Sequence, residues 1–203
     1  MPVATSSSRT DGESSDGRVQ RSQRSREAIV AALLELVGEG DRVPTAERVA
    51  ERAGVGIRTV FRHFSDMDSL YSAMADWVRQ QAAPYMAVPP IEGSLAERIE
   101  QFVELRSSLA ERLAPYFRSD TVLRWKSDFL QKQYRNAIRG QREHLLTFFP
   151  ELRNAPPDVL EAADCVSSLE TWERLRSCQN LSRSRAAAVR RRTLASLLEK
   201  VIE

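Results

Sequence analysis

The sequence has few of the residues, and none of the runs, that mark a disulfide framework, a metal site or a membrane span. It contains two cysteines, Cys165 and Cys178, whose spacing matches no metal-ligand pattern. Such sparse cysteine is typical of a reducing compartment. No apolar run approaches the roughly 18 residues that a membrane span requires, and the N-terminus lacks the apolar stretch of a secretory signal. We therefore expect an intracellular protein with no membrane partner.

The residue patterns of common enzymes are also missing. No G-x-x-x-x-G-K phosphate loop occurs in the sequence. The one pair that could form a nucleophile and a base, Cys165 with His144, is supported by nothing beyond composition. No segment alternates apolar and polar residues as a half-buried strand does. The sequence therefore predicts an all-α chain that is not an enzyme and that holds no cofactor and no metal.

Positive charge is unevenly placed along the chain. The 203 residues carry a net charge of only +2, and 42% of them are hydrophobic, which is enough for a packed core. The arginines between residues 18 and 62 are Arg18, Arg21, Arg24, Arg26, Arg42, Arg48, Arg52, Arg58 and Arg62. The acidic residues in and beside residues 45–64 are Asp41, Glu47 and Glu51. A basic region on a nearly neutral protein favours a polyanionic partner bound at one end.

Residues 45–64, TAERVAERAGVGIRTVFRHF, predict two short helices joined by a tight turn. Thr45 is a suitable N-cap because its hydroxyl can accept a backbone N–H. Gly54 stands where the first helix should stop, since glycine readily takes the positive φ of a helix C-cap. Val60 and Phe64 form the buried stripe of the second helix. The pattern is typical of a helix-turn-helix, whose second helix lies in the DNA major groove, although a plain αα-hairpin in a helical bundle would share it.

These residues resemble the N-terminal domain of TetR-family transcriptional regulators. The matching pattern is Thr45-x-x-x-Val49-Ala50-x-x-Ala53-Gly54-Val55-Gly56-x-x-Thr59-x-Phe61-x-His63-Phe64, followed by Leu70. The resemblance implies a DNA-binding domain of three helices, a linking fourth helix, and a C-terminal helical domain that binds an effector and forms a dimer.

The sequence departs from the family pattern at four positions. Val49 replaces isoleucine, Gly56 replaces serine, Phe61 replaces tyrosine, and Met67 stands where a phosphate-binding lysine is expected. The last three changes each remove a polar contact. A helical ligand-binding or protein-interaction module that has lost specific DNA binding therefore stays open as the alternative function.

The DNA-facing residues follow from the resemblance and from the charge pattern. Ile57 and Arg58 occupy the positions that point at base edges in the family, and arginine can pair with guanine O6 and N7. Phe61 could pack against a sugar or a thymine methyl. The full candidate set is Arg24, Thr45, Arg48, Gly56, Ile57, Arg58, Thr59, Phe61, Arg62 and His63. Plain surface solvation is the alternative for each arginine.

The chain divides into three predicted parts. Residues 1–20 have almost no large apolar residue and are expected to be a disordered arm, while residues 21–65 form the helix-turn-helix domain, with its first helix over residues 22–37. Whether the arginines of residues 21–26 touch DNA or are only solvated stays open. Residues 66–203 form the second domain, with a fourth helix from Asp66 to about Ala83.

Prolines and apolar spacing predict the remaining helices. Ser94 caps a helix that Pro115 is expected to stop, and residues 116–124 form a short helix or turn. A long helix follows over about 125–149. Pro157 begins the penultimate helix, which carries Val166, Leu169 and Trp172 on one face. The last helix covers about 184–201.

Two surfaces of the second domain are expected from the family. The candidate effector pocket comprises Phe102, Leu105, Leu109, Tyr116, Trp125, Phe129, Tyr134 and Trp172. The candidate dimer interface comprises Val166, Leu169, Leu194, Leu197 and Leu198. For both sets the alternative is an ordinary monomer core. We predict a cytoplasmic, nucleoid-associated regulator that binds a double-stranded DNA operator as a homodimer, in which a small-molecule effector of unknown identity releases a repressor.

Overall fold

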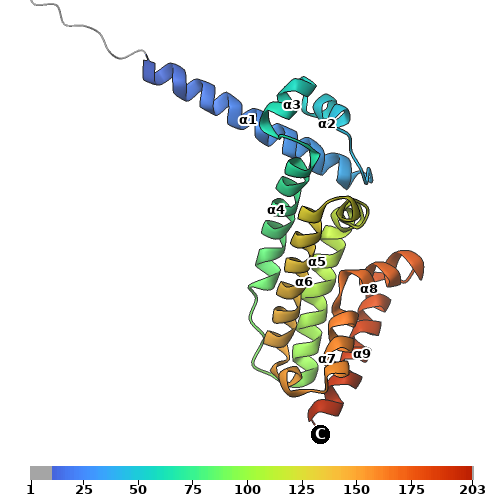
Figure 1. Cartoon of the computed structure of the whole chain (residues 1–203). Helices are drawn as coiled ribbons and strands as arrows, with labels where there is room; N and C mark the ends of the chain where they lie inside the picture. The colour runs from blue at the N-terminus through green and yellow to red at the C-terminus, as the bar shows by residue number, and fades with distance from the viewer. Residues whose placement is uncertain (1–10, 203) are drawn as a thin grey trace, which may run out of the picture. The chain divides into compact units, whose positions relative to one another are not determined.

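The computed structural model describes residues 11–202, and these residues are all-helical, as the sequence predicts (Figure 1). No strand occurs among them. The α-helices are α1 (Asp11–Gly38), α2 (Ala46–Ala53), α3 (Ile57–His63), α4 (Met67–Met86), α5 (Leu95–Leu123), α6 (Asp128–Phe148), α7 (Pro157–Ser167), α8 (Leu169–Glu173) and α9 (Arg183–Ile202). Shorter turns are the 3₁₀ helices η1 (Arg124–Lys126) and η2 (Pro150–Asn154) and the π-helix η3 (Arg174–Cys178).

The chain forms two compact units, Met1–Met74 and Ala75–Glu203, that divide inside α4. The first turns of α4 bury Leu70, Tyr71 and Met74. The hydroxyl of Tyr71 donates to the carbonyl of Pro44 at 2.9 Å. These contacts place the start of α4 in the N-terminal unit, so the division lies after the predicted boundary between residues 65 and 66.

The N-terminal unit packs α1 against α2 and α3 around a small core (Figure 1). Ile29, Leu33 and Leu36 are buried on α1, the stripe that the sequence predicts. From α2 and α3 come Val49 and Val60, each at most 1% exposed. Three short buried stripes therefore fix the helices of this unit without using the outer surface of α3.

The predicted disordered arm is wrong in its second half. We expected residues 1–20 to lack structure and the first helix to begin at residue 22, but α1 begins at Asp11; residues 1–10 lie outside the described residues. The first turn of a helix is costly, because several residues lose conformational freedom for a single hydrogen bond. Once the buried part of α1 has formed, each added residue gains one backbone hydrogen bond and only that residue is fixed, so the helix can extend into exposed residues. The bond from Gln23 to Glu27, at 2.8 Å, adds local support.

Proline does not interrupt the helices where we expected. Pro115 lies inside α5, so the predicted short helix or turn at residues 116–124 is part of α5. Proline removes one backbone donor, but Leu113 before it and Leu123 after it are both buried, and their packing holds the helix on course. Pro84 lies in the last turn of α4, where few backbone bonds remain to lose.

The C-terminal unit is a bundle of α5, α6, α7 and α9 (Figure 1). Its core is apolar and aromatic, with Phe102 in contact with the rings of Phe148 and Phe149 at centroid distances of 5.3 and 5.2 Å. Leu145, Leu194 and Leu198 are fully buried beside them. No helix in the described part of the chain combines the length and apolar character needed to cross a bilayer.

The penultimate helix is broken at Ser168, which we did not predict. Ser168 is extended (φ −70°, ψ 160°), and its hydroxyl accepts the N–H of Thr171 at 3.1 Å to begin α8. Val166 therefore lies in the last turn of α7, while Leu169 and Trp172 belong to α8. Serine favours this role because its hydroxyl replaces a backbone acceptor at a helix start.

Two buried arginines cover the carbonyls at the end of α7. Arg106 donates to Ser167 O at 3.0 Å and to Gln141 at 2.9 Å. Arg190 donates to Val166 O at 3.1 Å and to Ser168 O. The last carbonyls of a helix lack partners and carry partial negative charge. Burial lowers the pKa of Arg106 to about 10, so its guanidinium stays charged at neutral pH and suits this role.

His144 introduces a pH dependence into the bundle core. The ring is 6% exposed and stacks on Phe102, with centroids 5.7 Å apart. Its two nitrogens have no hydrogen-bond partner. Burial, and then the charge of Arg106, lower its pKa to about 4. Its unfolded pKa is near 6.5, so the unfolded state binds more protons between about pH 6.5 and 4, and stability falls as the pH falls through that window.

We predict that His144→Leu removes an acid-dependent loss of up to about 3 kcal/mol by pH 4. The measurement is urea unfolding of both proteins between pH 7 and pH 4. Asp120 acts in the opposite direction, because burial raises its pKa to about 6. The informative quantity is therefore the difference between the two proteins in how much their free energy of unfolding changes from pH 7 to pH 4. An equal loss of stability in both proteins would contradict the assignment.

Candidate nucleic-acid interface

The turn between α2 and α3 forms as the sequence predicts. Thr45 caps α2, with its hydroxyl accepting the N–H of Arg48 at 3.4 Å. Gly54 ends α2 in the left-handed region (φ 65°, ψ 32°). The N–H of Val55 then donates to Ala50 O at 3.0 Å, which closes the helix end. This turn sets the direction in which α3 leaves α2.

Helix α3 buries one side and leaves the other open. Within the helix only Val60 is buried, and Phe64 at its C-cap is 3% exposed. Ile57 and Phe61 are 37% and 45% exposed, which is unusual for large apolar side chains. Arg58 and Arg62 are also exposed, while Thr59 and His63 are half-buried. The open face therefore combines two apolar and two cationic side chains.

The arginines of α2 and α3 fall into two groups. Arg52 pairs with Glu39 at 2.7 Å and with Glu35 at 3.4 Å, and Arg48 pairs with Asp41. Arg58 and Arg62, by contrast, form no ion pair with any side chain in the described part of the chain. The unpaired guanidinium groups lie on α3, where an anionic partner can reach them without displacing a carboxylate.

Three of the predicted DNA-contacting residues, His63, Arg24 and Gly56, do not present a free polar side chain beside Arg58 and Arg62 on α3. The Nε2 atom of His63 is buried and has no hydrogen-bond partner. Burial, followed by the charges of Arg62 and Arg26, lowers the pKa of His63, so the ring is neutral at pH 7. Arg24 lies exposed on α1, away from the buried part of that helix. Gly56 begins α3 without a side-chain hydrogen bond.

The predicted effector residues lie in different surroundings. Phe102 and Leu109 are buried in the bundle. Trp125 is 74% exposed and Phe129 is 41% exposed. The other four residues are dispersed: Leu105 packs against the core, Tyr116 contacts Trp77, Tyr134 donates to Glu170, and Trp172 donates to Glu111. Helical spacing alone cannot separate a pocket wall from a core side chain, so this set stays a prediction.

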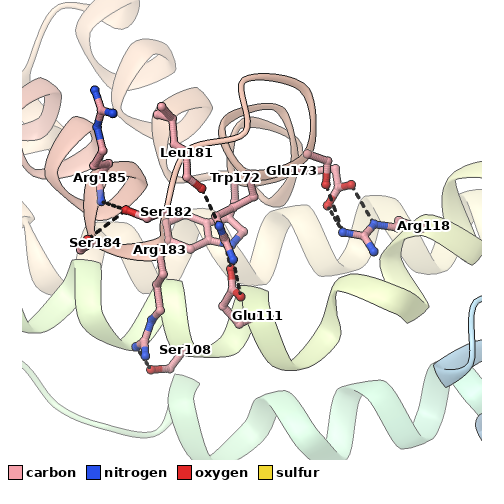
Figure 2. A network of polar contacts seen from close by, with 12 residues as sticks. Ser108, Glu111, Arg118, Trp172, Glu173, Leu181, Ser182, Arg183, Ser184 and Arg185 are labelled. Atoms are coloured by element: carbon pink, nitrogen blue, oxygen red, sulfur yellow. Dashed lines mark hydrogen bonds and ion pairs between the residues drawn. The ribbon is translucent and has the colours of Figure 1, made fainter.

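A hollow of about 250 Å³ lies elsewhere, between α5 and the segment from α8 to Asn180 (Figure 2). Trp172 is the one predicted pocket residue that lines it. Its lining residues are Glu111, Ala114, Arg118, Trp172, Glu173, Arg176, Ser177 and Asn180. The sequence gives a weak signal for it, since Glu111 and Arg118 are about two helical turns apart on one side of α5.

The charges around this hollow are paired with one another. Arg118 binds Glu173 at 2.7 Å, and Arg176 binds Glu111 at 2.7 Å (Figure 2). The indole N–H of Trp172 also donates to Glu111 at 2.8 Å. The bonds from Arg176 and Trp172 hold the pKa of Glu111 below its usual range. The hollow therefore presents satisfied ion pairs rather than a free charge.

The predicted dimer residues belong to the core of a single chain. Leu194 and Leu198 are fully buried, and Val166 is 8% exposed. Leu169 and Leu197 are partly buried against the same core. Leu194 and Leu198 are corrected to core residues, because they have no exposed surface to offer a partner, whereas the assignment of Leu169 and Leu197 stays a prediction. The exposed stripe of α9 is formed by Arg185, Ala188, Val189, Arg192, Ser196 and Glu199.

Residues for metal or nucleophile chemistry are not brought together. Within the described residues no group of three His, Cys, Asp or Glu side chains could hold a metal ion. Cys165 is an exposed free thiol, whereas His144 is buried among aromatic rings.

The two glycines that flank the turn give opposite predictions. Gly54→Ala should destabilise the N-terminal unit by about 1–2 kcal/mol, because a side chain at φ 65° is strained. Gly56→Ser is the matched control: its φ is −72°, a Cβ there meets open space, and a serine cap adds a few tenths of a kcal/mol. Urea unfolding measures both. Equal effects at the two positions would contradict the turn geometry.

Comparison with known proteins agrees with this geometry. The family model of bacterial regulatory proteins of the tetR family matches residues 25–74. The fold resembles the crystal structure of SCO7518 from Streptomyces coelicolor A3(2), described as a candidate transcriptional regulator, with a TM-score of 0.60 and 20% identity over 84% of this chain and 98% of that chain. No curated protein matches the chain significantly. Residues 25–74 therefore carry the sequence pattern of the tetR family of bacterial regulatory proteins, and most of the chain shares the fold of that solved structure.

Proposed function

We propose that the protein binds an operator as a homodimer in the cytoplasm and acts as a repressor that a small molecule releases. One observation carries the DNA side of this proposal: α3 is held by Val60 and Phe64 and presents unpaired Arg58 and Arg62 to solvent. A helix anchored on one side and open on the other can enter a major groove, which is wide enough to admit it.

The side chains of α3 divide the work of recognition. Arg58, near the N-terminus of α3, is the base-reading residue, because the N-terminal residues of a recognition helix contact base edges. Its fork can pair with guanine O6 and N7. Arg62, one turn later, holds a phosphate, and Phe61 packs on a sugar or a thymine methyl. Contacts of this second kind position the protein without reading sequence.

The remaining candidates position the backbone. Thr45 and Thr59 carry hydroxyls near the ends of α2 and α3, where backbone N–H groups favour phosphate. Arg48 keeps 57% of its side chain exposed despite its bond to Asp41, so it can still turn toward an anion. His63 is neutral and half-buried, and supports α3 rather than adding charge.

A dimer is needed because one recognition helix reads only a few base pairs. Two copies at a fixed distance read two half-sites about one or more helical turns apart. The exposed stripe of α9, with small Ala188 and 40% exposed Val189 flanked by Arg185 and Arg192, is the surface that we assign to this contact. Small residues on a helix allow a second helix to approach closely.

Release by an effector requires a link between the two units. Helix α4 belongs to both, since the division of the chain falls within it. Trp77 on its second half contacts Tyr116 of α5, with ring centroids 4.8 Å apart. A ligand that binds the C-terminal unit acts only through unequal affinity for the DNA-competent and DNA-incompetent states. The hollow beside Trp172 is the candidate place for such a ligand.

Arg58→Ala tests base reading. We predict a loss of affinity for the operator of roughly 5- to 150-fold, which corresponds to about 1–3 kcal/mol, with little change for random duplex. The matched control is Arg135→Ala, an exposed arginine on α6. Fluorescence anisotropy with operator and scrambled duplexes measures both. A similar loss on both duplexes would make Arg58 a phosphate contact only.

Val189→Arg tests the dimer surface. It adds charge beside Arg185 and Arg192 on both copies of an isologous contact, so we predict dissociation to monomers. Sedimentation velocity gives the oligomeric state, with Lys132→Glu on exposed α6 as the control. A wild-type protein that is monomeric, or a variant that stays dimeric, contradicts the assignment of this surface.

A further inference from the structure

Helix α1 is much longer than the part of it that contacts the core. It covers Asp11–Gly38, but among residues 17–38 the buried side chains begin only at Ile29. Residues 17–28 thus form about 18 Å of helix, at 1.5 Å per residue, that contain no buried residue. We call this part the α1 extension. A helix that has no apolar face gains no stability from packing on a core, so another interaction must account for this exposed helix.

The line of buried residues on α1 changes character at the extension. Upstream of Ile29, the positions on the same side of the helix are Ser25, Ser22 and Arg18, so small polar residues replace the apolar stripe. Val19 is the one large apolar residue there, and it is 65% exposed. The extension therefore has no surface suited to a coiled coil or to a protein core.

Charge is what the extension does present. Between residues 17 and 26 the sequence has four arginines and no acidic residue. Arg21 and Arg24 are exposed, and lie about 60° apart around the helix. The Nε of Arg21 donates to Gly17 O at 3.1 Å, and neither side chain pairs with a carboxylate in the described part of the chain.

A contact with α3 fixes where the extension begins. The guanidinium of Arg26 lies over the ring of Phe64, the C-cap of α3, at 5.0 Å from its centroid. The extension therefore begins beside the C-terminal end of α3, where the charges of Arg26 and Arg62 both act on His63. A duplex with α3 in its major groove has its phosphates along the edges of that groove, next to this end of the helix.

We propose that the α1 extension is a second, helical contact for the phosphate backbone of the duplex, made by Arg21 and Arg24. This inference rests on the proposed DNA binding by α3 and extends it. The extension reads no sequence: arginine on phosphate supplies affinity and register, while α3 supplies specificity.

The test is the salt dependence of binding by the full chain. Each phosphate contact contributes about −0.9 to the slope of log K against log salt. The double variant Arg21→Ala/Arg24→Ala should reduce that slope by about 2 and weaken operator and scrambled duplex by the same factor. Alanine is the best helix former, so the variant does not act by unfolding α1.

Two further variants make the test specific. Gln20→Ala/Gln23→Ala changes the same extension without changing charge, and should leave the slope unaltered. Ser22→Pro keeps every arginine but interrupts α1. It should make the slope of log K against log salt less steep than in the wild type. A slope as steep as that of the wild type would overturn the helical assignment.

The outcomes separate the two proposals. Operator-specific binding by wild type with an unchanged slope in the double variant overturns this inference alone. Loss of binding to anionic lipid vesicles, with duplex binding unaffected, also overturns it and assigns the extension to a membrane surface. Absence of operator-specific binding by wild type refutes the proposed function itself.

Discussion

The left-handed turn at Gly54 is the constraint on which the DNA-binding unit depends. It ends α2 abruptly, and the bond from Val55 to Ala50 O fixes the direction of the chain into α3. Helix α3 then needs only Val60 and the adjoining Phe64 to be held in place. Because so little of this short helix is used for packing, most of its surface remains available to a partner.

The many arginines of the chain serve different purposes in different surroundings. Arg52 is bound to glutamates and fixes the end of α1 to α2. Arg106 and Arg190 are buried on the carbonyls that end α7, and there the charge is structural. Arg58 on α3 is exposed and bound to no carboxylate among the described residues, so its charge is available to DNA. Composition alone could not distinguish these cases, because the distinction depends on which partners the fold brings near.

Local chemistry made the helix-turn-helix predictable, whereas tertiary packing decided what the sequence could not show. Gly54 stands where the C-cap of α2 requires a positive φ, and in the structure its φ is 65°. Pro115 has the opposite local preference, but burial on both sides of it keeps α5 continuous. Trp125 looks like a pocket residue by spacing and is mostly exposed, and the break at Ser168 depends on a serine whose capping role the apolar pattern hides.

The most direct measurement is photo-crosslinking from the exposed face of α3. A photoreactive phenylalanine analogue replaces Phe61, and the same group replaces exposed Trp125 as the control, in the presence of duplex from upstream of the protein's own gene. The account predicts covalent adducts to DNA bases from position 61 and none from position 125. Adducts from position 125 alone, or from neither position under conditions where the protein binds the duplex, would contradict it.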